Sequence, residues 1–289
     1  MGTMETEARG DALPKRRIEL TKAGWFGVAM VIFWVVMAFV GPLIAPFDQA
    51  DFVSDDTFLP VSGDFILGTD YLGRDILSRL LHGTQLTIGM AVVATLISTT
   101  VGSSFGLLSA IKGGHVDMVI SRINDALMSF PTIMMGLVVI AALGSSIPIL
   151  VCTTGLIYAT AVFRIARALG MDIKGLDYIE VARARGESLA WILFQEVLPN
   201  AAMPLVVDFG IRLSFAILFM SSLSFLGLGV QPPNADWGSM VRENMTGLPS
   251  GSLASVFPAL AIASLTIGLN LIVDDYAARS GRGMAKRMT

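Results

Sequence analysis

The chain has 289 residues, of which 54% are hydrophobic and 15% are charged, and its formal net charge is −3. Because soluble domains carry about 25% charged residues, this composition favours a protein that lies in a lipid bilayer. The weakly acidic balance provides no basic surface for nucleic acid, and the single cysteine, Cys152, excludes an internal disulfide.

Several sequence motifs of enzymes are missing from the chain. It has no Gly-x-x-x-x-Gly-Lys-[Ser/Thr] phosphate loop, no Gly-x-Ser-x-Gly elbow and no His-Glu-x-x-His pair. The only histidines, His82 and His115, are far apart in sequence, so a His/Cys metal site is not expected either. Together these absences make an enzyme the less favoured class, and we assign no catalytic residue.

Six apolar segments are each expected to cross a bilayer as a helix. They comprise residues 25–45, 84–111, 126–144, 147–163, 205–230 and 257–273. The first is too long for the core of a signal peptide, so we expect an uncleaved helix. Gly102 and Gly106 in the second have the Gly-x-x-x-Gly spacing that lets helices approach closely, which we interpret as packing within the fold. The third carries Pro131 in its first third.

The distribution of Lys and Arg predicts the orientation of these six helices. The chain has 20 such residues, of which five precede the first helix, two lie between the second and third, five between the fourth and fifth, and four follow the sixth. The opposite connections hold only Arg74, Arg79 and Arg242. Since positive residues collect on the cytoplasmic side, both termini are predicted to be cytoplasmic.

We therefore expect an all-α polytopic membrane protein with six transmembrane helices. The predicted organisation is a cytoplasmic tail over 1–22, a first helix with an external loop over 23–83, a transmembrane core over 84–275 and a cytoplasmic tail over 276–289.

A polar stretch interrupts the apolar sequence between the fourth and fifth helices. Asp177 and Glu180 have the Asp-x-x-Glu spacing of a helix start, in which the aspartate side chain caps the first turn. Gly186 stands where a left-handed residue commonly ends a helix. We expect short helices over 178–185 and 188–197, with Pro199 breaking the chain before the fifth membrane helix.

This helix–glycine–helix element carries more apolar side chains than a solvated loop needs, namely Ile179, Val181, Ala182, Leu189, Ile192 and Leu193. They must be buried against something, either the membrane domain or a partner protein. An amphipathic helix lying on the lipid surface is the competing interpretation, and the pattern alone does not separate the two.

The same stretch resembles the EAA loop of permease subunits of ATP-binding-cassette importers, whose pattern is roughly Glu-Ala-Ala, three residues, Gly, nine residues and Ile-x-Leu-Pro. The matching positions are Glu180, Ala182, Gly186, Leu198 and Pro199. Val181 replaces the first alanine of the pattern, and Glu196 stands where isoleucine is usual.

Further segments resemble the dipeptide/oligopeptide/nickel group of these permeases, on the side of the pair to which the C-type subunit belongs. "LGTDYLGRDILSRLLHG" (67–83) resembles its Gly-Thr-Asp-x-x-Gly-Arg-Asp signature, and "LPNAAMPL" and "SSLSFLGLGVQPPNADWGSM" resemble others. The residues that carry the first signature are Gly68, Thr69, Asp70, Gly73, Arg74 and Asp75. They suggest an external docking face for the binding protein or a gate of the translocation pathway. The competing interpretation is a structured loop that local ion pairs hold in place.

The resemblance implies a type I importer permease fold in the bacterial inner membrane, in which the EAA loop is a cytoplasmic coupling helix. It implies a second homologous permease subunit, two ATP-binding subunits that carry ATP and Mg, and an extracytoplasmic substrate-binding protein, with no cofactor on this chain. The residues implied in coupling to the ATPase are Glu180, Ala182, Arg183, Ala184, Gly186, Leu198 and Pro199.

The sequence departs from this group at two places. Met220 stands where glutamate is common, and "VDDYAARSGRG" from Val273 replaces a usual Gly-Asp-Gly-Leu-Arg-Asp ending. Both departures bear on the substrate: peptides are the leading expectation, while nickel chelates, opines and sugars stay open.

Ionisable and aromatic residues at membrane depth complete the list of candidates. Asp208 and Arg212 are four apart on the fifth helix, a functional-site hypothesis by default, although we favour a mutual ion pair near the cytoplasmic end. Asp274 and Asp275 are expected to be solvated at the membrane edge, and Trp237 is expected to be an interface anchor.

Two other classes of membrane protein predict different sequence features. An ion-coupled secondary transporter predicts repeated halves with ion ligands in broken helices, and a membrane enzyme predicts clustered catalytic polar residues. Neither pattern is present in the sequence.

Overall fold

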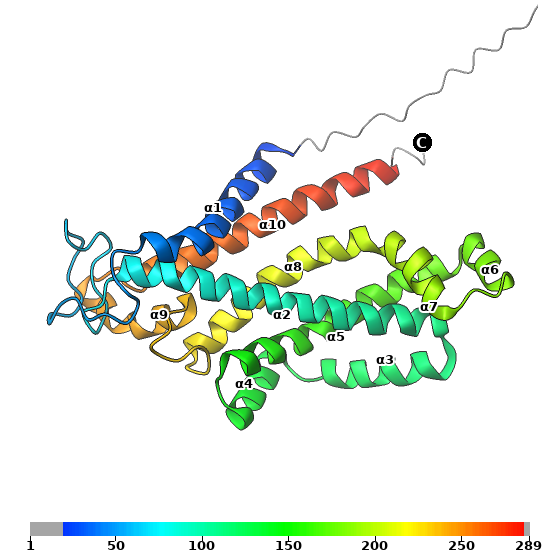
Figure 1. Ribbon diagram of the computed structural model, residues 1–289, viewed down its shortest axis with the longest axis horizontal. Helices are drawn as coiled ribbons and strands as arrows, with labels where there is room; N and C mark the ends of the chain where they lie inside the picture. Colours follow the sequence, from blue (N-terminus) through cyan, green and yellow to red (C-terminus); the bar gives the residue numbers. More distant parts are fainter. Residues whose placement is uncertain (1–19, 286–289) are drawn as a thin grey trace, which may run out of the picture.

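The computed structural model describes residues 20–285. The predicted N-terminal tail, with its cluster of Lys15, Arg16 and Arg17, and the last residues of the predicted C-terminal tail lie outside the described residues. The described chain forms an elongated bundle of helices with no strand (Figure 1).

The α-helices, in chain order, are α1 (Lys22–Ile44), α2 (Ile76–Lys112), α3 (Gly114–Met128), α4 (Thr132–Leu143), α5 (Ile147–Lys174), α6 (Asp177–Ala184), α7 (Leu189–Trp191), α8 (Leu198–Phe225), α9 (Trp237–Glu243) and α10 (Val256–Ala285). A π-helical turn, η1 (Ile192–Val197), joins α7 to α8, and a 3₁₀ turn, η2 (Met245–Ser250), follows α9. Five of the described segments are long and apolar enough to cross a membrane, and α3 with α4 makes a sixth if this bent pair counts as one span. The all-α polytopic prediction is therefore confirmed.

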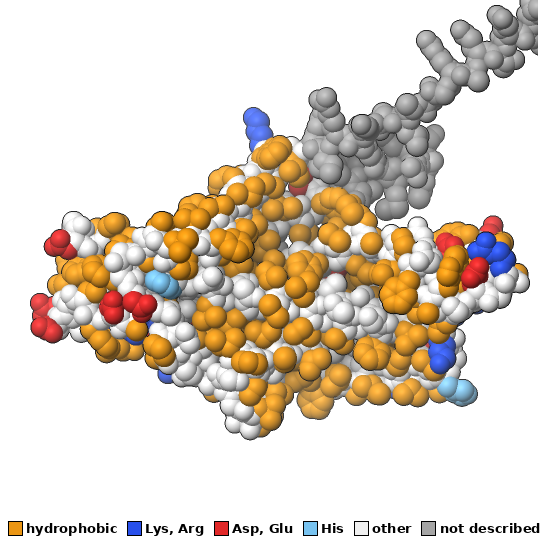
Figure 2. Space-filling view, in the orientation of Figure 1, with side chains coloured by type: hydrophobic (Ala, Val, Ile, Leu, Met, Phe, Trp, Pro, Cys, Tyr) orange, Lys and Arg blue, Asp and Glu red, His pale blue; other side chains and the backbone are white. Residues whose placement is uncertain are grey.

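Charged side chains collect at the two ends of the bundle and apolar side chains cover the band between them (Figure 2). One end holds α9 and the long connection between α1 and α2, and the other holds α6 and α7 (Figure 1). An apolar band between two polar ends is the surface that a bilayer requires.

The centre of the bundle is the seam between α2 and α5, which glycines hold together. A Cβ atom added at Gly102 would lie 2.6 Å from the Ala159 carbonyl oxygen, and one added at Gly106 would lie 2.7 Å from that of Phe163. This close approach confirms that the Gly-x-x-x-Gly spacing serves packing within the fold.

The first helix packs against the last. A Cβ at Gly27 would lie 2.7 Å from the Gly268 carbonyl oxygen, and the Trp34 indole N–H donates to Ser264 at 2.8 Å. The backbone N–H of Thr21 donates to Asp275, which is buried. Asp275 is therefore not solvated as expected, because its carboxylate sits at the positive N-terminal end of α1.

The third predicted span is not one straight helix over 126–144. α3 ends at Met128, α4 begins at Thr132, and the two are bent by 87°. Pro131 lies at the break, where its missing N–H and the restriction it places on the preceding residue prevent the helix from continuing.

Pro199, in contrast, does not break the chain as predicted. Residues 189–225 form one continuous helical segment, in which the Leu198 N–H bonds to the Leu193 carbonyl five residues back. Because Pro199 occupies the first turn of α8 directly after the π turn, its missing N–H is tolerated there.

Several predicted boundaries differ from the observed ones. α2 begins at Ile76 rather than at 84, since Asp75 caps it by accepting from the Ser78 N–H at 2.7 Å. α5 continues to Lys174, α8 ends at Phe225, and α10 continues through the predicted tail to Ala285. α2, α5 and α10 thus extend beyond their apolar segments, whereas the carboxyl end of α8 falls short of the predicted one.

Candidate functional site

The predicted helix–glycine–helix element lies at one end of the bundle. α6 covers Asp177–Ala184, and Gly186 adopts a φ of +81° directly after it. The Gly186 N–H donates to the Arg183 carbonyl at 2.9 Å, and the Glu187 N–H donates to the Ala182 carbonyl at 3.1 Å. These two bonds form a Schellman motif, so the turn predicted at the glycine is confirmed.

The start of α6 differs from the predicted capping box. The N-cap position is Leu176, and no side chain caps the helix there. Asp177 and Glu180 instead lie inside the first turn, where negative charge favours the exposed N–H groups of the helix end.

The inner face of α6 is buried against the membrane helices. Ile179 and Ala182 are fully buried, in a cluster with Ile111 of α2, Ile173 of α5 and Val197 of η1. This burial favours docking over an amphipathic helix lying on lipid. Ala182 faces the membrane domain, so its small size permits close approach there and not to an outer partner.

Basic side chains of this region bind the end of α2. Arg183 donates from Nη2 to the Ile111 carbonyl at 3.2 Å, and Lys174 donates from Nζ to the Ala110 carbonyl at 2.9 Å. These carbonyls belong to the last turn of α2, where positive charge is favourable. Arg183 is therefore engaged with this chain's own α2.

The outer face of α6 is exposed in the described part of the chain. Glu180, Ala184 and Gly186 are exposed, and Val181 is 57% exposed. No atom lies within 4 Å of a Cβ built at Gly186. Of the other predicted coupling residues, Leu198 is half-buried and Pro199 is exposed on the first turn of α8.

The predicted external signature lies at the opposite end and forms a buried ion-pair network. Asp70 accepts from the backbone N–H and the Nε of Arg74, at 2.9 and 2.8 Å, and is paired with Arg79. Glu243 of α9 completes it, with Oε2 lying 3.2 Å from Arg74 and 3.1 Å from Arg79. This arrangement supports the reading of a loop held by ion pairs.

The other members of the signature shape the same loop. Thr69 forms an isolated β-bridge with Asp75, and Gly68 and Gly73 adopt φ values of +81° and +73°. Thr69 is buried, and its hydroxyl accepts from the Leu59 N–H at 2.8 Å. The signature therefore joins the external loop to α2 and, through Glu243, to α9.

The connection between α8 and α10, predicted to be external, is anchored inside the protein. Trp237 is fully buried, its indole N–H donates to the Leu80 carbonyl at 3.2 Å, and it contacts Trp34 edge to face. It is not the membrane-interface anchor that we expected. Asp236 caps α9 by accepting from Gly238 at 3.0 Å, and burial raises the pKa of this carboxyl because desolvation disfavours its charged form.

Asp208 and Arg212 form the predicted ion pair, with Nη2 of the arginine 3.1 Å from Oδ1 of the aspartate. Asp208 is the eleventh and Arg212 the fifteenth of the 28 residues of α8, which lies within one continuous helical segment over Leu189–Phe225. Met220, where the sequence departs from the resembling group, is buried in the apolar core.

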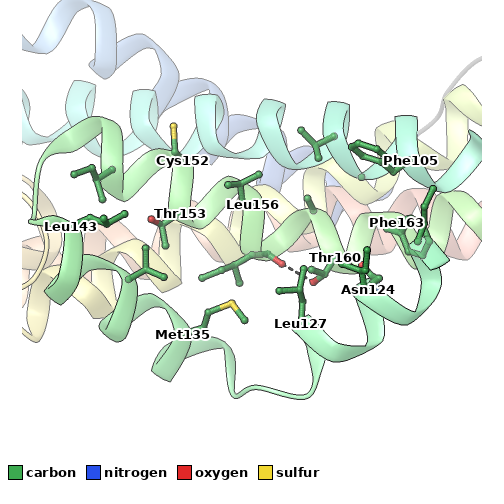
Figure 3. A pocket seen from close by; sticks show the side chains of 18 of the residues that line it. Phe105, Asn124, Leu127, Met135, Leu143, Cys152, Thr153, Leu156, Thr160 and Phe163 are labelled. Atoms are coloured by element: carbon green, nitrogen blue, oxygen red, sulfur yellow. Dashed lines mark hydrogen bonds between the residues drawn. The ribbon is translucent and has the colours of Figure 1, made fainter.

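A large apolar pocket of about 760 Å³ opens between α2, α3, α4 and α5 (Figure 3). Phe105, Leu127, Met135 and Leu156 are among its lining side chains. The Thr160 hydroxyl donates its proton to the Ile157 carbonyl of its own helix at 2.7 Å. Asn124, Thr153 and Thr160 are the few polar side chains of an otherwise apolar lining, so the pocket suits lipid or apolar side chains better than the polar groups of a peptide.

One contact that sequence reasoning missed holds α3 to α5. Asp117 accepts from Nε and Nη2 of Arg167 at 2.6 and 2.7 Å, a bidentate pair between residues 50 apart. The only signal was that both residues flank apolar segments on the same predicted side of the membrane. Within the described residues, no three His, Cys, Asp or Glu side chains gather to hold a metal.

Comparison with known proteins agrees with this geometry. Residues 102–286 match the family described as "Binding-protein-dependent transport system inner membrane component". The chain is 35% identical over 246 residues to the glutathione transport system permease protein GsiD of Pectobacterium atrosepticum, which covers 84% of this chain and 81% of that protein. It is 31% identical over 254 residues to the dipeptide transport system permease protein DppC of Haemophilus influenzae, which covers 86% of each. The chain therefore belongs to the family of binding-protein-dependent transport system inner membrane components.

Proposed function

We propose that this chain is the transmembrane permease subunit of an ATP-driven importer and forms half of the translocation pathway for peptides. Family membership supports the permease role and disfavours an ion-coupled secondary transporter. The substrate class is supported by the names of two relatives, one a glutathione and one a dipeptide permease. Both of those substrates are small peptides with free carboxylates.

The observation that carries this proposal is the two-sided character of α6. Its inner face, with Ile179 and Ala182, is buried against α2, α5 and η1, while Val181 and Glu180 are exposed. A helix held in this way transmits a push on its outer face to the membrane helices beneath it. Switching by nucleotide requires such a packed element with two arrangements.

The assembly that we propose has a second permease subunit, two separate ATPases that carry ATP and Mg, and an extracytoplasmic binding protein. Its support is the absence of a phosphate-binding loop from this chain together with the family description. We place the complex in the bacterial inner membrane with both termini of this chain in the cytoplasm. In this orientation α6 faces the ATPases, and the loop with Asp70 faces the binding protein.

The test of the proposal is the turn that ends α6. Gly186→Val places a β-branched residue at a φ of +81°, which is strained for any residue with a Cβ. We expect peptide uptake and peptide-stimulated ATPase activity of the assembled complex to fall at least about tenfold, with normal membrane abundance. Gly175→Val is the matched control, because Gly175 has a φ of −79° and only an ordinary contact, 3.7 Å from the Asp172 carbonyl oxygen.

Normal uptake by Gly186→Val at normal abundance would remove the coupling role from α6. Equal loss of uptake in Gly175→Val would show general damage to the loop, and loss of abundance alone would mean that the glycine serves folding only.

A further inference from the structure

Arg212 faces an open pocket beside the bend between α3 and α4. This pocket has a volume of about 370 Å³, and its lining includes Arg212, Phe215, Tyr158 and Thr132. Pockets of about 300–1,000 Å³ are typical for small molecules, so a dipeptide fits its size. Arg212 lies in a helical segment that is long and apolar enough to cross a membrane, where an ionisable side chain is a functional-site hypothesis by default.

The guanidinium of Arg212 is only partly used by its partner. Oδ1 of Asp208 accepts a hydrogen bond from Nε at 3.1 Å, and the same oxygen lies 3.1 Å from Nη2 as an ion pair. Among the described residues, no hydrogen bond uses Nη1 or the second N–H of Nη2. The Nη1–Nη2 edge is therefore available, and this edge is a planar fork that matches a carboxylate bidentately.

The ion pair between Asp208 and Arg212 differs from a purely structural ion pair in having an unsatisfied buried atom. Asp208 is 4% exposed, and its second oxygen, Oδ2, has no hydrogen-bond partner in the described part of the protein. A buried pair that stabilises a fold needs its remaining polar atoms satisfied. This pair leaves unused atoms on both members.

The bend places a second source of positive potential at the same pocket. Thr132 and Ile133, the first two residues of α4, line it, and no side chain caps the α4 N-terminus. The exposed N–H groups at the start of a helix favour an anion. In this pocket they come from α4, whereas Arg212 comes from α8.

We propose that Arg212 binds the carboxylate of the transported peptide in the pocket between α4, α5 and α8. The proposal rests on the proposed function, because it assigns a contact within the pathway that this chain is proposed to form. Asp208 orients the guanidinium and holds it toward the pocket, so it is a positioning residue.

The experiment measures import of labelled alanyl-alanine and of its C-terminal amide by the whole complex in proteoliposomes. We expect Arg212→Gln to lower import of alanyl-alanine at least about tenfold and import of the amide much less. Every sample contains the same binding protein. Its own preference between the dipeptide and the amide therefore cancels when import by the variant is divided by import by the wild type for each substrate. Arg212→Lys should give intermediate import, because lysine keeps the charge but not the fork. Arg122→Gln, on the exposed side of α3, is the matched control and should import normally.

A double variant separates binding from structure. If Arg212 only neutralises Asp208, Asp208→Asn combined with Arg212→Gln removes the uncompensated charge and restores import; if Arg212 binds the carboxylate, the double variant stays at least about tenfold impaired. Restored import, unchanged import by Arg212→Gln alone, or equal loss for both substrates would each overturn the carboxylate site. If the wild-type complex imports neither substrate, the proposed function itself fails.

Discussion

A single carboxylate, Asp70, joins two arginines from different elements at the end of the protein that is predicted to be external. Arg74 belongs to the loop and Arg79 to α2, and both also approach Glu243 of α9. All but Glu243 are nearly inaccessible to solvent. Two positive charges buried together are tolerated only because two carboxylates face them.

Removing one carboxylate from this network should destabilise the external end strongly. Asp70→Asn leaves two buried guanidinium groups with one acidic partner, and breaking a buried pair costs about 3–5 kcal/mol. We expect a clearly lower melting temperature of the purified protein and lower membrane abundance. Asp64→Asn, at an exposed position of the same loop, should change the free energy of unfolding by less than about 0.5 kcal/mol. Equal effects of the two substitutions would contradict the network's role.

At the scale of elements, the seam between α2 and α5 decides how the membrane helices are arranged. Lipid tails are as apolar as the side chains of these helices, so close packing replaces the hydrophobic effect as the source of association. Gly102, Gly106, Gly155 and Gly170 all contribute positions where the two helices nearly touch.

The close packing of α2 against α5 predicts that alanine substitutions at two glycines of α2 change stability differently. A Cβ at Gly106 would lie 2.7 Å from the Phe163 carbonyl oxygen, whereas no atom lies within 4 Å of a Cβ at Gly89. Gly106→Ala should therefore separate α2 from α5 and cost about 1–3 kcal/mol. Gly89→Ala should be neutral or slightly stabilising, because alanine favours a helix over glycine by about 1 kcal/mol. Thermal unfolding in detergent compares them, and a similar melting temperature for both variants would contradict the seam.

For the whole molecule, the two polar ends and the apolar band define how the protein sits in a membrane (Figure 2). The end with α6 carries Lys174, Arg183 and Arg185, and the other end carries the buried, paired Arg74 and Arg79 together with the exposed Arg242. The positive-inside rule acts on the first group and predicts that α6 faces the cytoplasm.

Cysteine labelling tests this orientation. In a Cys152→Ala background, single cysteines replace Asp55 in the external loop and Arg185 after α6, both of which are exposed. We expect an impermeant thiol reagent to label position 55 in intact cells and position 185 only after the membrane is opened. Labelling of position 185 with protection of position 55 in intact cells would invert the proposed topology.

The sequence by itself determined the features that depend on neighbouring residues. Apolar length predicted where helices cross the membrane, and the position of Gly186 predicted a left-handed turn because few other residues adopt that backbone conformation. The tertiary structure alone decided which side of each helix is buried. In a bilayer the lipid-facing and protein-facing sides of a helix are both apolar, so the sequence pattern does not separate them. For α6 and α9, which lie at the polar ends, the sequence could not show that Ala182 faces the membrane helices or that Trp237 is buried, because the residues that cover them are distant in the chain. It also could not bring Asp70 to Glu243, or place Arg212 beside the start of α4, because these neighbours are brought together only by the folded path of the chain.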